Sequence, residues 1–464
     1  MGPKRRAACV QAVQHELAGA ALTDLRQRKR LPQIVERMAA APQKGLPQIF
    51  RDASQLEAAY RFFSNERVDP SMMLAAHGEE TRRRAAQASH VVVAHDTTEF
   101  AFGGERKSLG RLTGKSRGFL AHFALAVDGT TGMPFGVLHC EAVVRGEERK
   151  NRERAGPEDD TNEALRWGRG AAAVHAILPG AVQVMDREAD SYALFESMLV
   201  RRQDFVVRLS HRERRADGGP IGELATAASV VAEREVLLSP RKQQSSKDSV
   251  RHPARRARLA RLQVSATRAD LLRGQNMPVH YSPRLVVNVV RVVEPQPPRG
   301  DEPVEWMLYT SLPIDTPEQI LAVVDAYRKR WLIEEFFKGL KTGCALEKRQ
   351  LESVHALLNV LAISVPIAWH LLRLRTLARV DPDAPAESLL THAQMHCLRA
   401  ELPNSGRHAL SAHPTAREVL LGIARLGGHL SNNGDPGWLV IGRGFQDLLM
   451  LARGFRLANR SDQS

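Results

Sequence analysis

The sequence predicts an α/β fold with a mixed β-sheet, a β-rich insertion and a helical region toward each end of the chain. Apolar residues recur at three- and four-residue spacing through residues 11–88, as they do in amphipathic helices. From residue 90 onward, short β-branched runs alternate with helical stretches. From residue 354 the pattern is again helical and apolar. The 464 residues allow two to four domains at roughly 100–200 residues each.

The first 88 residues are expected to form a small, basic helical domain. Its first helix has an apolar stripe that includes Leu31, Ile34 and Met38, and turn-forming residues around Pro42 separate it from a second helix near residues 54–63. Five basic side chains accompany the first helix: Arg26, Arg28, Lys29, Arg30 and Arg37.

The central region is expected to contain three strands in series, followed by helix, strand, helix and strand. The predicted strands are residues 91–94, 119–127, 134–144, 182–185 and 205–209, and the predicted helices are residues 162–178 and 190–201. A meander followed by parallel strands makes a mixed sheet, and this order suits an RNase-H-like fold. Other α/β folds share the order, so it does not identify the fold by itself.

Residues 211–303 are expected to form the β-rich insertion within a domain that spans residues 89–375. Strand-like runs flank a stretch with eight Lys or Arg residues between positions 241 and 261 and one acid, Asp248. An electropositive binding loop and a solvated loop fit this stretch equally well. A strand at 305–312 and a capped helix over 316–341 follow. Residues 376–464 form the predicted C-terminal helical domain.

Charge and cysteine usage narrow the class of protein. The 66 Lys and Arg residues against 52 Asp and Glu give a net charge of +14, which favours a polyanionic partner such as nucleic acid, although a merely solvated basic protein has the same balance. The four cysteines are far apart and form no CxxC pair, which favours reduced thiols. Polar residues and Pro366 interrupt the most apolar segment, 357–372. We therefore expect a buried helix there, no membrane partner and a cytoplasmic location.

Two aspartates follow predicted strands. Asp96 comes after the strand at 91–94, and Asp186 comes after the strand at 182–185. Carboxylates at the ends of neighbouring strands are suited to share divalent cations such as Mg²⁺, which prefer oxygen ligands. An aspartate at a strand end is more often a turn former or a helix cap, so each alone is weak evidence.

The predicted helix over 316–341 carries a third carboxylate within a basic stripe. Its five polar residues at intervals of three, four, four and three are Tyr327, Arg330, Glu334, Lys338 and Lys341. This spacing places them on one continuous helical face. Cations around one carboxylate suit the binding of a phosphate backbone beside a metal ion. A solvated helix face also mixes charges, so the spacing alone leaves both interpretations open.

The same residues resemble a known family. Tyr327, Arg330, Glu334 and Lys341 match the Y-(2)-R-(3)-E-(6)-K signature of the insertion-sequence-four family of bacterial DDE transposases. Blocks elsewhere agree with this family in order, at residues 59–62, 96–98, 114–118, 186–190, 205–208 and 424–428. The resemblance therefore covers nearly the whole chain.

The resemblance implies a cut-and-paste DNA transposase with an RNase-H-like catalytic domain. Asp96, Asp186 and Glu334 would be the catalytic residues and would bind two divalent ions, Mg²⁺ or Mn²⁺. A homodimer would bind the terminal inverted repeats through residues 1–88, pair through residues 376–464, cleave the transposon ends through hairpins and join their 3′-hydroxyls to target DNA. The DNA contacts implied are Tyr327, Arg330, Lys338, Lys341, Trp306, Arg208, Arg26, Arg30 and Arg61. Trp306 would stack on a flipped base, although simple core packing is the alternative.

Two other functions remain open at this point. A metal-dependent nuclease would keep the fold without the joining step, but Trp306 and Tyr327 favour hairpin handling. A non-catalytic regulator of transposition would be expected to lack the N-terminal basic domain or a catalytic carboxylate, and both are present. Two departures from the family stand out: Phe337 replaces a polar residue, and residues 381–415 show little resemblance.

Overall fold

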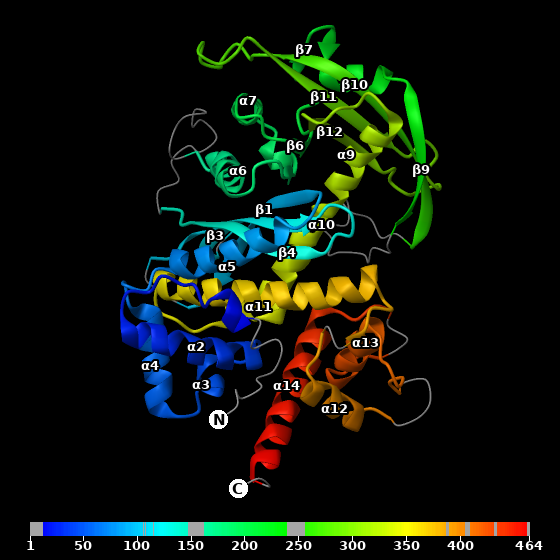
Figure 1. The fold of residues 1–464 in the computed structure, drawn as a ribbon. Helices are drawn as coiled ribbons and strands as arrows, with labels where there is room; N and C mark the ends of the chain where they lie inside the picture. The colour runs from blue at the N-terminus through cyan, green and yellow to red at the C-terminus, as the bar shows by residue number, and fades with distance from the viewer. Residues whose placement is uncertain are drawn as a thin grey trace. The chain divides into compact units, whose positions relative to one another are not determined.

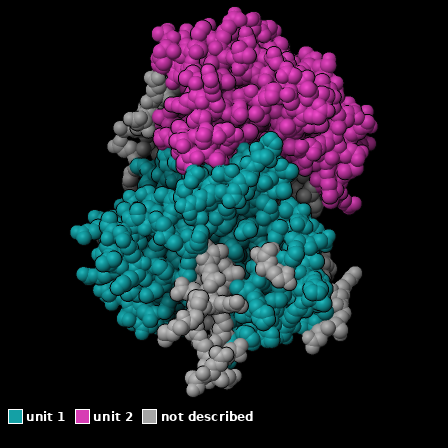
Figure 2. Space-filling model, viewed as in Figure 1, with its two compact units in different colours: residues 1–91, 96–150, 331–464 teal, residues 92–95, 151–330 magenta. Residues whose placement is uncertain are grey.

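The computed structural model describes residues 13–104, 106, 108–114, 116–146, 162–238, 256–386, 389–403, 409–430 and 434–461. The chain divides into two compact units (Figure 2). Unit 1 contains residues 1–91, 96–150 and 331–464, and unit 2 contains residues 92–95 and 151–330. Each unit joins segments that are distant in the sequence. The domain boundaries predicted near residues 88 and 375 stay a prediction.

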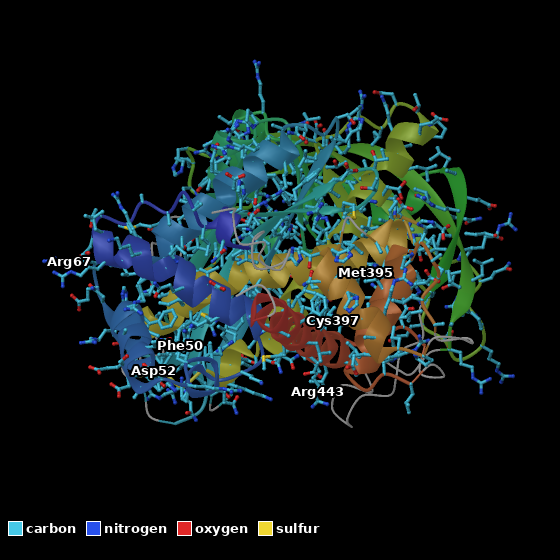
Figure 3. All side chains as sticks on the ribbon, turned by 60° about the horizontal axis from the view of Figure 1, so that its bottom comes forward. Phe50, Asp52, Arg67, Met395, Cys397 and Arg443 are labelled. Carbon is cyan, nitrogen blue, oxygen red and sulfur yellow. The ribbon has the colours of Figure 1, made fainter. Side chains whose placement is uncertain are left out.

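Unit 1 begins with helices, as the N-terminal pattern predicts. They are α2 (Leu25–Ala40), α3 (Leu46–Ile49), α4 (Ala53–Ser64) and α5 (Pro70–Ala85). Aspartate side chains accept backbone N–H groups at three of their N-termini, and Asp52 does so at α4 by accepting from Gln55 at 3.0 Å. Figure 3 labels Asp52 and Phe50, which lie close together before α4. The guanidinium of Arg37 lies 5.2 Å from the centre of the Phe50 ring.

The strands of unit 1 are longer than the sequence pattern predicts. They are β1 (Val91–Phe102), β2 (Gly110–Arg111), β3 (Arg117–Asp128) and β4 (Pro134–Val143). The expectation that the first strand stops before Asp96 is wrong, because β1 continues to Phe102. Residues 97–102 favour strand and alternate between buried and half-buried positions, and pairing with β3 sustains them. Asp96 therefore lies within a strand.

The rest of unit 1 is helical. It contains α10 (Trp331–Lys338), the π-helix η3 (Gly339–Gly343), the short η4 (Leu346–Lys348), α11 (Val354–Val380), α12 (His392–Glu401), α13 (Ala416–Leu426) and α14 (Trp438–Ser461). Helix α11 packs on α5 and β4 (Figure 1). It confirms the predicted buried helix but continues through Pro366. It is long and apolar enough to cross a membrane, yet 89% of its most apolar window is buried, as in the core helix of a folded domain.

Unit 2 is built on a sheet covered by helices. Its first elements are α6 (Leu165–Ile177), β5 (Val182–Met185), η2 (Arg187–Ala189), α7 (Tyr192–Val200) and β6 (Phe205–Arg208). The insertion contains β7 (Arg215–Ala216), β8 (Gly219–Pro220), α8 (Ile221–Ala227), β9 (Val230–Leu238), β10 (Arg258–Leu272) and β11 (Arg284–Val293), and β12 (Glu305–Thr310) and α9 (Pro317–Lys329) follow it. A core that includes Trp167, Phe195 and Tyr309 holds the sheet, the helices and the insertion together.

The strand order confirms the expected fold. It runs β4-β3-β1 in unit 1 and β1-β5-β6 in unit 2, with β1 common to both. Strands β3 and β4 pair antiparallel, whereas β1, β5 and β6 are parallel. This mixed sheet, in which β3 and β4 pair antiparallel and β1, β5 and β6 run parallel, has the order expected of an RNase-H-like core. In unit 2, antiparallel β12, β11 and β10 extend the sheet from β6, and β10 and β11 belong to the predicted β-rich insertion.

The basic stretch of the insertion differs from the expectation. The fifteen-residue strand β10 begins inside it, at Arg258. Arg258 is mostly buried and binds the buried carboxylate of Glu294 and that of Asp301, and Arg261 binds Glu233 across to β9. These two arginines therefore hold strands together. Residues 239–255, with the other basic residues except Arg256, lie outside the described part of the chain.

The helix predicted over 316–341 is interrupted. Thr316 caps α9 with the predicted capping box, but α9 ends at Lys329, where the N–H of Arg330 binds the carbonyl of Tyr327 in a tighter turn. A new helix, α10, begins at Trp331, and the backbone is π-helical from Gly339 to Gly343. The prediction of one continuous helical stripe is therefore wrong. A tight turn and a wide π-turn each change the angular spacing that the stripe requires.

Candidate active site

Asp186 lies directly after β5 in unit 2. The strand is buried and ends at Met185, and Asp186 turns the chain into η2 by accepting the N–H of Glu188 at Oδ1 (2.9 Å). Ala94 of β1 pairs with Val184 of β5 in parallel register. Asp186 is thus two residues beyond Val184, as Asp96 is two residues beyond Ala94 along its own strand. Asp186 is half-buried, with one oxygen engaged in the turn.

Three of the residues implied as DNA contacts surround a fourth, Tyr327, in unit 2. The Trp306 ring, on β12, lies 5.7 Å from the Tyr327 ring at 60°. Burial raises the pKa of the Tyr327 phenol, while the charges of Arg330 and Arg208 oppose that rise and Asp186 adds to it. We call Asp186, Arg208, Trp306, Tyr327 and Arg330 the tyrosine cluster. It combines a neutral phenol, two guanidiniums and an indole beside a carboxylate, a set suited to a phosphate chain and its bases.

Asp96 and Glu334 lie in unit 1. Asp96 is half-buried in β1 and accepts the N–H of Thr97 at 2.7 Å. Glu334 is half-buried in the first turn of α10, whose Phe336 and Phe337 rings pack at 5.5 and 5.7 Å from the ring of Phe123 on β3. Phe337, which replaces a polar residue of the family signature, is therefore a core residue that fixes α10 on the sheet.

The two lysines of the signature region differ in their surroundings. Lys338 is exposed and binds Glu335 at 2.8 Å. Lys341 lies on η3, with its ammonium 5.6 Å from the centre of the Phe100 ring on β1. The π-turn carries this lysine away from an ideal α-helical position.

The arginines implied in the N-terminal domain are accessible. Arg26 and Arg61 are exposed on α2 and α4, and Arg30 is half-buried on α2. Arg61 forms one exposed ion pair with Glu57 at 3.6 Å, and Arg30 binds Gln33 at 3.3 Å. Exposed pairs of this kind are weak and exchange readily for phosphate.

Sequence reasoning missed two acidic residues that hold the segments near the predicted carboxylates in the fold. Asp190 is fully buried in its side chain and accepts the N–H groups of Ser210 and His211 at 2.7 and 2.9 Å, and Arg214 binds its other oxygen. Glu335 plays a similar part for α10, because it binds Arg375 of α11 and accepts the indole N–H of Trp438 of α14 at 3.0 Å. The acidic residue at each position was visible in the sequence, but its distant partner was not.

The donor set fits a hard divalent cation. All three predicted ligands supply carboxylate oxygens and neither sulfur nor imidazole, as Mg²⁺ and Mn²⁺ prefer. Within the described part of the chain, no three His, Cys, Asp or Glu side chains are gathered as a ready metal-binding group. Like-charged carboxylates repel until a cation joins them.

Comparisons with known proteins agree with this chemistry. The family model described as "Transposase DNA-binding" matches residues 10–68, and the model described as "Transposase DDE domain" matches residues 87–365, more than half of the chain. A solved structure described as "Cryo-EM structure of piggyBac transposase synaptic complex with hairpin DNA" is similar over 80% of this chain and 73% of that chain, at 9% identity and a TM-score of 0.34. So distant a likeness carries no conclusion. The two family models do: the chain belongs to the DDE transposases, enzymes that use divalent metal ions to cleave DNA and transfer its strands.

Proposed function

We propose that this transposase moves DNA by cut-and-paste transposition with Asp96, Asp186 and Glu334 as its catalytic carboxylates. The observation that carries the proposal is the tyrosine cluster, which brings two arginines, a phenol and an indole to the carboxylate at the end of β5. The parallel register of β1 and β5 supports Asp96 as the partner of Asp186. The signature Tyr327-Arg330-Glu334-Lys341 supports Glu334 as the third, and supports membership of the insertion-sequence-four family.

In this proposal the three carboxylates hold two divalent ions. Such ions would activate the attacking water or 3′-hydroxyl and stabilise the leaving oxygen. The side chains of the enzyme would then position the strand. Arg330 and Arg208 would bind phosphate oxygens through fixed guanidinium geometry, and Lys338 and Lys341 would add charge along the same strand.

Trp306 and Tyr327 support the cleavage of ends through hairpins. Trp306 is half-buried and keeps part of its indole accessible, although its ring packs beside Tyr327. A flipped base stacks well on an indole face. A tyrosine phenol is neutral near pH 7, and burial raises the pKa of Tyr327 further. Its hydroxyl would therefore donate a hydrogen bond to phosphate without adding negative charge.

The DNA partners of this enzyme include the ends of its transposon, which the N-terminal domain would bind. Arg26 and Arg30 on α2 and Arg61 on α4 would contact its phosphates, and their accessibility supports this role. We further propose that two copies pair the ends through the C-terminal helices, that target DNA is joined in the same complex, and that the protein works in the cytoplasm on the nucleoid. A homodimer would bring both ends together before cleavage.

Replacing Arg61 with alanine should weaken binding of the end duplex and lower its salt dependence. One lost phosphate contact reduces the slope of log K against log salt by about 0.9. Fluorescence anisotropy with the end duplex at several salt concentrations measures this. Arg201→Ala, which removes an exposed arginine outside the N-terminal domain, should leave the slope unchanged. Equal slopes for Arg61→Ala and the wild type would remove Arg61 from the interface.

The test of the proposed function is cleavage of a plasmid carrying the element's own ends, with Mg²⁺ or Mn²⁺, by wild type and by Glu334→Ala. We expect excision and joining by the wild type only, with end binding intact in the variant. Equal cleavage by both proteins would show that Glu334 is not catalytic. Cleavage without joining would identify a nuclease, and end binding without cleavage by either protein would identify a regulator.

A further inference from the structure

The turn Cys344–Arg349 ties the N-terminal helices to the segment that follows the catalytic signature. Arg349 is only 2% exposed. Its guanidinium donates to the carbonyl oxygens of Pro42 and Lys44, in the loop between α2 and α3, and to that of Cys344 at 3.0 Å. A planar group with five donors is suited to bind three carbonyls at once. One buried side chain therefore joins the DNA-binding segment to this turn.

The same turn also holds β1. The Glu347 carboxylate accepts the N–H of Ala101 at 2.9 Å, and Arg106 donates to the carbonyl of Arg349 at 2.7 Å. Ala101 lies five residues beyond Asp96 on one continuous strand. The turn thus fixes the far part of the strand that carries Asp96.

A third contact reaches the end of the signature segment. The amide of Gln43, from the loop between α2 and α3, donates to the carbonyl of Thr342 at 3.3 Å. Thr342 follows Lys341 in η3, and η3 continues directly from α10, which carries Glu334. The loop of the DNA-binding segment therefore contacts both the turn and the η3 segment that precedes it.

The backbone of the turn is strained at Ala345. Its φ of 47° and ψ of 40° lie in the left-handed region, which costs a residue with a side chain about 1–3 kcal/mol. Such a conformation persists only where its surroundings determine it. The bonds made by Cys344, Glu347 and Arg349 on either side supply that constraint.

We infer that Arg349 is a positioning residue for the DDE reaction. Through the turn it fixes the positions of the Asp96 strand and the Glu334 helix relative to the α2–α3 loop. A transposon end bound by the N-terminal helices would then meet the carboxylates at a fixed nucleotide. The inference rests on the proposed roles of Asp96 and Glu334. Its consequence is that loss of Arg349 shifts where and how fast the enzyme nicks, while the affinity for the end remains.

The test compares Arg349→Met and Gln43→Ala with the wild type on a labelled duplex of the transposon end. Anisotropy gives the Kd, single-turnover nicking at saturating enzyme gives the rate, and a sequencing gel gives the nick position. For Arg349→Met we expect a Kd within about threefold of wild type and nicking roughly 10- to 100-fold slower, since displacements of about 1 Å at a reacting centre cost that much. The nicks should spread over neighbouring nucleotides, and Gln43→Ala should show the same change in smaller degree.

Gln87→Ala, an exposed glutamine at the end of α5, is the matched control and should nick like the wild type. If Arg349→Met fails to fold, which a thermal melt shows, Gln43→Ala decides the question. Wild-type nick positions and rates in the variants that fold would overturn the inference. So would a fall in rate that a weaker Kd explains in full. A wild type that does not nick, or a Glu334→Ala variant that does, would instead contradict the proposed function.

Discussion

Asp186→Asn should abolish cleavage and leave the fold intact. Asp190→Asn, four residues later, should destabilise the fold and retain cleavage. The two aspartates belong to one short motif, but their surroundings differ. Asp186 is half-buried at a strand end and raises the pKa of Tyr327, whereas the side chain of Asp190 is fully buried against Arg214. These surroundings fit the proposed catalytic role for Asp186 and indicate a structural role for Asp190.

The size of each effect follows from these surroundings. If Asp186 binds a metal ion, its loss removes several kcal/mol of transition-state stabilisation, which slows cleavage about 10³-fold or more. Asn at position 190 leaves the mostly buried guanidinium of Arg214 without its counter-charge, and breaking a buried pair in this way costs about 3–5 kcal/mol of unfolding free energy.

Urea unfolding and single-turnover cleavage, each measured on both variants, check this crossed pattern. Asp186→Asn should unfold at the wild-type urea concentration and still bind the transposon end. Asp190→Asn should unfold earlier and retain cleavage at a temperature where it is folded. A stable but inactive Asp190→Asn would contradict the structural role of Asp190, and an active Asp186→Asn would contradict the catalytic role of Asp186.

Local sequence pattern predicted much of this fold because its signals are local. The β-branched runs before Asp96 and Asp186 and the capping box at Thr316 depend on neighbours within a few residues, and the structure has strands and a helix at these places. The fixed spacing of the signature led to the family, because few other folds need that set of side chains. The C-terminal helix α11 follows equally from its continuous apolar composition.

What the sequence did not predict depends on partners that are far away in the chain. Strand β10 starts in a basic stretch because Glu294 and Asp301 neutralise Arg258, and neither acid is near it in sequence. The break at Arg330 and the π-turn after Lys338 leave no compositional mark. Two of the three carbonyls that hold Arg349 lie about 300 residues earlier. Periodicity carries no information about such contacts.

A buried network around His77 predicts a loss of stability in mild acid. His77 Nδ1 lies 2.6 Å from the Glu16 carboxylate, and its Nε2 accepts the N–H of Val137 at 3.1 Å. A ring nitrogen that accepts a backbone N–H carries no proton, so His77 is neutral and donates from Nδ1 to Glu16. Arg84 binds the same carboxylate and lies 4.3 Å from the ring centre of Trp369. The network joins the N-terminal segment to β4 and α11.

The pKa shifts give the direction of the pH dependence. Burial lowers the pKa of His77 below 6.5 against the pull of Glu16, and burial lowers that of His370 to about 4. Burial raises the pKa of Glu16, but the hydrogen bonds from His77 and Arg84 outweigh burial and lower that pKa from 4.5 to about 2. As the pH falls, these three groups therefore bind protons in the unfolded chain before they do so in the folded chain. Stability should be full above pH 6.5, fall first through the histidines, and fall further below pH 4.5 through Glu16.

His77→Phe should separate these contributions. The ring fills the space but leaves the Val137 N–H and the Glu16 carboxylate each short of a partner, which costs about 2–4 kcal/mol at pH 7.5. Urea unfolding of unit 1 from pH 7.5 to 5 should also show a shallower slope than the wild type, by up to ~1.4 kcal/mol per pH unit for one proton no longer taken up on unfolding. The exposed His90→Phe should change neither quantity. A variant that loses stability but keeps the wild-type slope would mean that His77 is charged in the folded protein. Val137 would then have no acceptor, and the tautomer derived from that bond would be wrong.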